Sequence, residues 1–158
     1  MLLTGWRSNV TTYGYQLVTL NHYSLRSAES YLVKRDRGRV NHVDRDQGLN
    51  YWFRMNNNAH RDTRARDHLP MVKAELERLM SDPQIAAQHH ACVAAHQAKI
   101  ASLKQRPDYA ILLRDITSDR MIRLSRMHHA FGSEIFLQGP DAVPAGVEDA
   151  VPLPIKPD

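Results

Sequence analysis

Two consecutive helices are predicted for residues 69–105, which read LPMVKAELERLMSDPQIAAQHHACVAAHQAKIASLKQ. In the first, over about 69–80, four apolar residues recur at the spacing of one helix face. They are Leu69, Val72, Leu76 and Leu79. The second, over about 83–105, has Asp82 as its predicted N-cap and Pro83 at its first position. Its expected packing stripe is Ile85, His89, Cys92, Val93, His96, Ile100 and Leu103. This long helical stretch indicates a mainly α fold.

Shorter helices are predicted downstream of that stretch. Pro107 breaks the pattern, and helices over about 108–116 and 118–130 follow, with Gly132 as the stop of the second. Residues 138–158 are rich in proline and show no apolar period. We therefore expect an extended, flexible tail there.

Upstream, a helix is predicted over about 27–37. Either Ser24 or Ser27 is a suitable N-cap, and Gly38 is the expected stop. A short helix is predicted over about 46–55, where apolar and aromatic residues gather.

One strand is predicted near the N-terminus, over residues 15–20, which are rich in β-forming side chains. The predicted fold class is therefore mainly α, a helical, bundle-like C-terminal region with one or two short strands near the N-terminus. Composition divides the chain into a basic segment 1–66, a helical segment 67–137 and the proline-rich segment 138–158.

Charge and cysteine content narrow the possible classes of protein. The 158 residues carry a net charge of +4, and residues 1–66 hold eleven bases against five acids. Arginine dominates that segment, and its planar fork suits phosphate, carboxylate or nucleic acid. The single cysteine, Cys92, excludes an intramolecular disulfide, and no run of apolar residues is long enough to span a membrane. We therefore expect a cytoplasmic protein without a membrane span.

Two patterns could in principle bind a metal ion. His89, Cys92 and His96 share one predicted helix face, as zinc ligands can, but the same positions are needed for packing, which we favour. Residues 44–46 form an Asp-x-Asp triplet, a pattern that can hold a divalent cation. Pairing with the neighbouring arginines is the simpler explanation of that triplet.

A longer pattern occupies residues 20–38, which read LNHYSLRSAESYLVKRDRG. Its order of Asn-His-Tyr, Arg-Ser, Glu-x-Tyr-Leu, Lys and Arg-Gly resembles the C-terminal motif of bacterial glycosyltransferases of family 2 and the family 92-like group, which have the GT-A fold. Residues 50–56 resemble the segment that follows this motif. The resemblance covers about residues 15–60, and the helices up to about residue 137 look like the C-terminal extension of that subgroup.

The resemblance implies transfer of a sugar from a nucleotide-sugar donor to a hydroxyl of a glycan or lipid-linked acceptor, with a divalent metal, Mn or Mg, as cofactor. His22 would contribute to metal binding in such an enzyme. The positions that match the donor diphosphate-binding part of the motif are Lys34, Arg35 and Arg37. The remaining motif positions would be framework: Asn21, Tyr23, Ser27, Glu29, Tyr31 and Gly38.

Such enzymes also contain a nucleotide-binding half with an Asp-x-Asp motif before the histidine. Neither feature precedes His22 here, and the triplet at 44–46 lies downstream of it. We therefore expect this chain to be the C-terminal portion of a glycosyltransferase, with little or no activity alone. An upstream polypeptide would supply the rest of the sheet, and no catalytic residue is assigned.

A second hypothesis makes the chain a small basic helical scaffold module. It would contact an acidic partner or nucleic acid through its arginine-rich first third, with aromatic residues close by. The residues that suggest this role are Arg26, Arg35, Arg37, Arg39, Arg45, Arg54, Tyr51 and Trp52.

Overall fold

The computed structural model describes residues 23–38 and 47–152. These residues form helices and no strand, so the predicted mainly α class is confirmed. The predicted strand at 15–20 lies outside the described residues. The α-helices are α1 (Ala28–Arg37), α2 (Leu49–Met55), α3 (Leu69–Met80), α4 (Pro83–Lys104), α5 (Pro107–Ile116), α6 (Asp119–Ser125) and α7 (Ser133–Gln138). Short 3-10 helices are η1 (Arg64–His68), η2 (His128–Ala130), η3 (Pro140–Ala142) and η4 (Val147–Ala150).

Local capping determines where the main helices begin and end. Of the two candidate caps of α1, Ser27 is the one used, since its hydroxyl accepts a hydrogen bond from the Ser30 amide at 3.1 Å. Gly38 follows the last residue of α1 with a φ of 74°, a conformation that favours glycine. The Asp82 carboxylate caps α4 by accepting from the amides of Gln84 and Ile85. The predicted helix 118–130 is instead split, because α6 ends at Ser125 and η2 follows.

One hydrophobic core joins α1, α2, α5 and α6 to the C-terminal end of α4. Tyr31 and Leu32 of α1 are fully buried, as is Phe53 of α2. The other buried apolar side chains are Tyr51, Trp52, Leu103, Tyr109, Leu112, Ile116, Met121, Leu124, Met127 and Val143. Residues before and after position 66 thus pack into the same core, because α1 contacts α4 and α5 while α2 contacts α5, α6 and α7.

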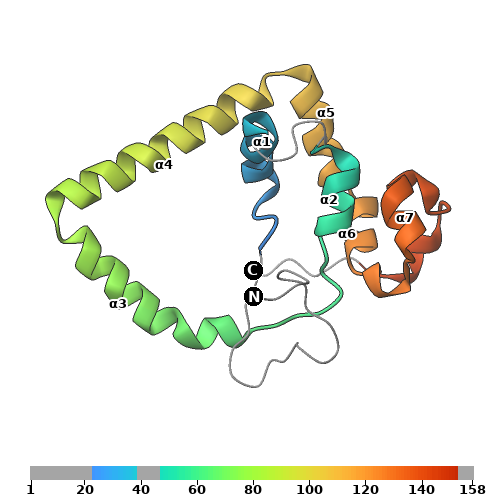
Figure 1. Ribbon diagram of the computed structural model, residues 1–158, viewed down its shortest axis with the longest axis horizontal. Coiled ribbons are helices and arrows are strands. Elements are labelled where there is room, and N and C mark those ends of the chain that lie inside the picture. The colour runs from blue at the N-terminus through green and yellow to red at the C-terminus, as the bar shows by residue number, and fades with distance from the viewer. Residues whose placement is uncertain (1–22, 39–46, 153–158) are drawn as a thin grey trace, which may run out of the picture.

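In Figure 1 α4 extends away from this core, and α3 turns back from the far end of α4 at a wide angle. Every residue of α3 except Met80 is exposed, and α4 has its only buried residue, Leu103, near its C-terminal end. The predicted packing stripe of this helix therefore needs correction. It packs against the core only toward its end, and His89, Cys92 and Val93 face solvent.

Residues 138–152 correct the expectation of an extended, flexible tail. Val143 is buried in the core, and Arg120 of α6 donates to the carbonyl oxygens of Pro140 and Val143 at 3.2 and 2.7 Å. Arg120 also pairs with Glu148 at 2.5 Å.

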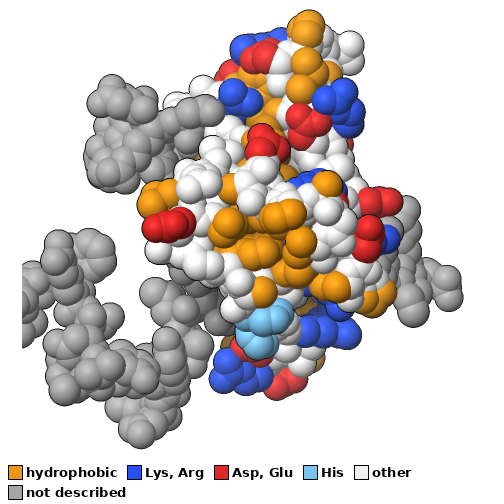
Figure 2. All heavy atoms as spheres, turned by 90° about the vertical axis from the view of Figure 1, so that its right-hand side faces the viewer, with side chains coloured by type: hydrophobic (Ala, Val, Ile, Leu, Met, Phe, Trp, Pro, Cys, Tyr) orange, Lys and Arg blue, Asp and Glu red, His pale blue; other side chains and the backbone are white. Residues whose placement is uncertain are grey.

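The face that carries α7 shows hydrophobic side chains gathered at its centre (Figure 2). Leu137 of α7 is one of the exposed hydrophobic residues.

Candidate anion-binding site

A basic cleft of about 360 Å³ lies beside α1. Most of its lining residues belong to the glycosyltransferase-like pattern at 20–38, of which residues 23–37, called the motif run below, contribute to the cleft. We call it the basic cleft, and its lining residues are Tyr23, Ser24, Arg26, Ser30, Tyr31, Val33, Lys34, Arg37 and His96. Three of these are cations, none is a carboxylate, and several carry hydroxyl groups. Cations and hydroxyl donors without a competing carboxylate suit an anionic ligand such as phosphate.

Lys34 lies at the base of this cleft and connects two segments of the chain. Its ammonium donates to the Ser24 carbonyl oxygen at 2.5 Å and to the Tyr51 hydroxyl at 3.2 Å. The same ammonium lies 5.0 Å from the centre of the Tyr51 ring. Lys34 therefore positions the wall of the cleft in addition to contributing positive charge.

The three predicted diphosphate ligands do not converge. Lys34 and Arg37 line the basic cleft, whereas Arg35 is not among its lining residues. The Arg35 guanidinium instead lies 5.4 Å from the centre of the Tyr109 ring. The reason is helical geometry, since neighbouring residues on a helix point about 100° apart.

The motif residues expected to be framework make structural contacts where they are described. The buried Tyr31 hydroxyl donates to the carbonyl oxygens of Gln47 and Gly48 at 2.6 and 2.9 Å, which connects α1 to the start of α2. Glu29 pairs with Lys104 at 2.7 Å. Tyr23 differs, because it is exposed and lines the cleft. Asn21 and His22 lie outside the described residues.

α1 is held against α4 by polar contacts that also bring His96 to the cleft. Ser30 Oγ lies 3.1 Å from His96 Nε2. Asp36 pairs with Lys99 at 2.7 Å and with Arg106 at 3.3 Å. The hydrogen bond from Lys99 is the main reason why the pKa of Asp36 lies below its usual value, and burial opposes it. Asp36 is therefore engaged with α4 and α5 and leaves the cleft basic.

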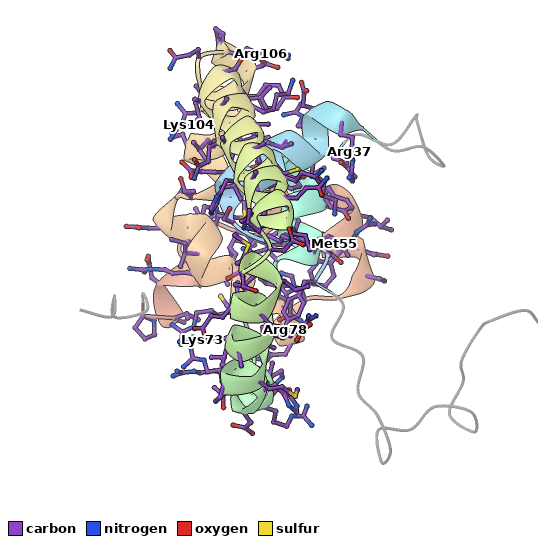
Figure 3. The ribbon with its side chains drawn as sticks, turned by 90° about the vertical axis from the view of Figure 1, so that its left-hand side faces the viewer. Arg37, Met55, Lys73, Arg78, Lys104 and Arg106 are labelled. Atoms are coloured by element: carbon purple, nitrogen blue, oxygen red, sulfur yellow. The ribbon has the colours of Figure 1, made fainter. Side chains whose placement is uncertain are left out.

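A second, larger cleft of about 580 Å³ adjoins the first along the segment from Tyr23 to Arg26. We call it the asparagine cleft, because its far wall is Asn56, Asn57 and Asn58 with Met55, His60, Arg61 and Asp62. Met55 of this cleft and Arg37 of the basic cleft lie on the same side of α4 in Figure 3. Asp62 is its one carboxylate, and hydrogen bonds from the side chain and the backbone amide of Arg64 lower the Asp62 pKa to about 2. The surface around Tyr23 thus offers cations in both clefts and side-chain amides in the asparagine cleft.

The described residues do not fit a divalent metal. Over residues 23–38 and 47–152, no group of three or more His, Cys, Asp or Glu side chains is arranged to hold an ion. His89, Cys92 and His96 therefore do not form such a group, and His96 Nε2 instead lies 3.1 Å from Ser30 Oγ. The Asp-x-Asp triplet at 44–46, like His22, falls outside the described residues.

Five residues that line the cleft are absent from the predicted donor site: Ser24, Arg26, Ser30, Val33 and His96. Ser24 and Ser30 belong to the motif run, so their spacing relative to Lys34 was a usable signal. His96 lies 66 residues from Ser30, and only the packing of α4 on α1 brings it there. No periodicity or motif could have indicated this contact.

The aromatic residues of the scaffold hypothesis lie in the core. Tyr51 is 9% exposed and Trp52 is 5% exposed, so neither ring offers a face on which a nucleic-acid base can stack. Arg26, Arg37 and Arg54 are exposed, and Arg26 and Arg37 belong to the basic cleft.

No family model, curated protein or solved structure matches this chain. Within the described residues, no helix has the length and apolar content needed to cross a bilayer.

Proposed function

We propose that this chain forms the donor diphosphate-binding part of a bacterial, cytoplasmic glycosyltransferase that uses a nucleotide-sugar. The observation that supports this most directly is the basic cleft. Its wall is built from the motif run at 23–37, and its lining combines three cations with hydroxyl groups and lacks any carboxylate. A departing nucleoside diphosphate carries its negative charge on phosphate oxygens, which such a lining binds and stabilises.

In this proposal Arg26 and Arg37 bind the diphosphate and Lys34 positions the wall between them. Both arginines are exposed at the cleft, where their guanidinium groups can reach a phosphate, whereas Lys34 is held by Ser24 and Tyr51. The nucleotide-binding strands, and the base that deprotonates the hydroxyl of the glycan or lipid-linked acceptor, come in this proposal from an upstream polypeptide. The resemblance also implies Mn or Mg, for which the described residues provide no ligand set.

The proposal is tested by titrating the chain with pyrophosphate and with a nucleoside diphosphate, each with and without Mn²⁺, by calorimetry at low salt. We expect both ligands to bind. Arg37→Ala should weaken binding about threefold to tenfold, as expected for loss of one exposed charge-assisted contact. The matched control is Lys73→Ala, which removes the same charge from α3, away from the cleft.

Two results would contradict the proposal. One is the absence of pyrophosphate and nucleotide binding under all four conditions. The other is an equal loss of affinity in the Arg37 and Lys73 variants, because that would show a response to net charge alone. Arg35→Ala adds a sharper comparison, since Arg35 stacks on Tyr109 and should leave the affinity unchanged.

The scaffold hypothesis, with an acidic partner or nucleic acid, uses the same exposed arginines. It differs in its expected dependence on salt and on ligand length. Nucleic-acid affinity falls steeply as salt rises, with a slope that grows with the number of phosphates contacted. Tight binding of an oligonucleotide with a steep slope, together with no response to pyrophosphate, would favour the scaffold function over the glycosyltransferase function.

A further inference from the structure

The exposed part of α4 has an unusual composition for a surface helix. Sixteen consecutive residues, 83–98, contain no Asp, Glu, Lys or Arg, although such residues make up 24% of the whole chain. Six of the sixteen are alanine. In Figure 3 the labelled Lys104 lies at the end of α4 that packs on the core, and the labelled Lys73 and Arg78 lie on α3. Depletion of charge is typical of the centre of a protein interface.

The apolar face of α4 continues from the core into solvent. Leu103 is buried and Ile100 is half-buried, where α4 packs on α1 and α5. At helical spacing the same face runs on through Val93 and Ile85, which are 40% and 43% exposed. The part of the face that the core leaves uncovered therefore keeps apolar side chains, although His89 and His96 lie on it as well.

α3 adds a second apolar stripe next to the first. Leu69, Val72, Leu76 and Leu79 share one face of α3, and each remains exposed, Val72 by 55%. Within the described residues the main contacts of α3 are with α4 and η1, and its apolar stripe stays exposed. Two adjoining helices thus present uncovered apolar faces, which on a water-soluble surface indicates an interaction site.

We infer that this α3–α4 surface, residues 69–98, binds the same surface of a second copy of the chain. A two-fold contact places identical patches together, so a charged patch would repel itself, and the stretch 83–98 has no charge to do so. The absence of Lys and Arg there also disfavours an anionic lipid surface or an acidic partner as the occupant.

The surface is also large enough for a dimer. Six exposed aliphatic side chains lie on the two faces, and at roughly 80 Å² each they bury about 500 Å² per copy. The alanines of α4 permit close approach of two helix backbones and add further contact area. The total for two copies is about 1,000 Å² before the alanines are counted, which is the size of a weak, reversible interface.

The oligomeric state of the full chain tests this inference directly. Sedimentation velocity from low micromolar to submillimolar concentration should show a reversible dimer. Val93→Glu and Leu76→Glu each place a carboxylate on one apolar face and should weaken dimerisation at least about tenfold. Both residues are exposed in the single chain, so its circular dichroism should stay helical. The control is Leu137→Glu, which adds the same charge at a 73% exposed position on α7 and should leave the dimer intact.

Cys92 provides an independent readout, because it is the only cysteine and lies within the uncharged stretch of α4. Two copies of α4 that cross near its middle bring the two Cys92 thiols together, and a short bis-maleimide should link them. With Cys92→Ser and Ser102→Cys combined, the thiol moves about 15 Å along the helix and linking should fail. The inference would be overturned if the chain stayed monomeric at all concentrations. It would also be overturned by a dimer that only Leu137→Glu disrupts, or by a dimer in which Cys92 forms no cross-link.

Discussion

His128 is a titratable side chain inside an aromatic cluster. It is 8% exposed and packs against Phe53, Phe131 and Phe136, with its ring centre 4.9 Å from that of Phe136. No described residue hydrogen-bonds to its Nε2 atom. Burial lowers the pKa of His128 below its ordinary value of 6.5, and a hydrogen bond to the Phe53 backbone partly opposes this shift. The folded state therefore favours the neutral imidazole.

This shift predicts a loss of stability in mild acid. The unfolded chain, with a His128 pKa near 6.5, binds the proton more tightly than the folded chain does. The stabilising contribution is thus complete above that pH and is lost as the pH falls through it toward the folded pKa. In urea unfolding at pH 7.5, 6 and 5, the urea concentration at the midpoint should decrease with pH for the wild type. His128→Phe should make this decrease smaller. His129→Phe changes the exposed neighbour and should leave the dependence of the midpoint on pH as it is in the wild type. An unchanged slope in both variants would refute this assignment.

At the scale of elements, the turn between α7 and η3 packs closely on α2. Gly139 has φ 98° and ψ −175°, a region open essentially to glycine alone. A Cβ atom there would overlap Asn50 of α2, whose Cγ would lie 2.6 Å away. The exposed Asn50 side chain can shift away from an added carbon, so the positive φ is the main reason why residue 139 is glycine.

Gly139→Ala should therefore lower the free energy of unfolding by about 3 kcal/mol, from backbone strain and the overlap with Asn50. Gly132→Ala is the matched control, because Gly132 has an ordinary φ of −77° and no atom within 4 Å of the added carbon. Its effect should stay within about 0.5 kcal/mol. Thermal unfolding of the two variants measures both values, and equal effects would show that the close packing does not limit residue 139.

At the scale of the whole molecule, the C-terminal segment completes a core that begins with α1. Val143 is 4% exposed in the same core as Tyr31 and Leu124, and Arg120 and Arg123 pair with Glu148 and Asp149 of η4. Val143→Ala should thus destabilise the whole fold, by about 1–2 kcal/mol in urea unfolding. Val147→Ala, in the same segment but exposed, should cost less than about 0.5 kcal/mol. A wild-type stability for Val143→Ala would mean that this segment is dispensable.

The positions of α1, α3, α4 and α5 were predictable because their signals are local, whereas the split of the predicted helix 118–130 and the presence of α7 were not predicted. Ser27, Asp82 and Gly38 act on amides and carbonyls within a few residues of themselves, and an apolar period is visible within a single helix. The same local signals led to a wrong prediction for residues 138–152. Proline and the lack of an apolar period argue against a long helix, but they do not argue against packing of this segment on the core. Likewise the stripe of α4 showed an apolar face, without showing which part of that face the core covers.

The sequence by itself therefore determined the mainly α class, the helix caps and the basic, hydroxyl-rich run that forms one wall of the cleft. Only the tertiary structure decided that Arg35 turns to Tyr109, that His96 joins Ser30 and that Val143 enters the core. The physical reason is distance along the chain. A cap or a helix face depends on neighbours within about one turn, whereas the contact between Ser30 and His96 spans 66 residues and exists only once the core has brought α1 and α4 together.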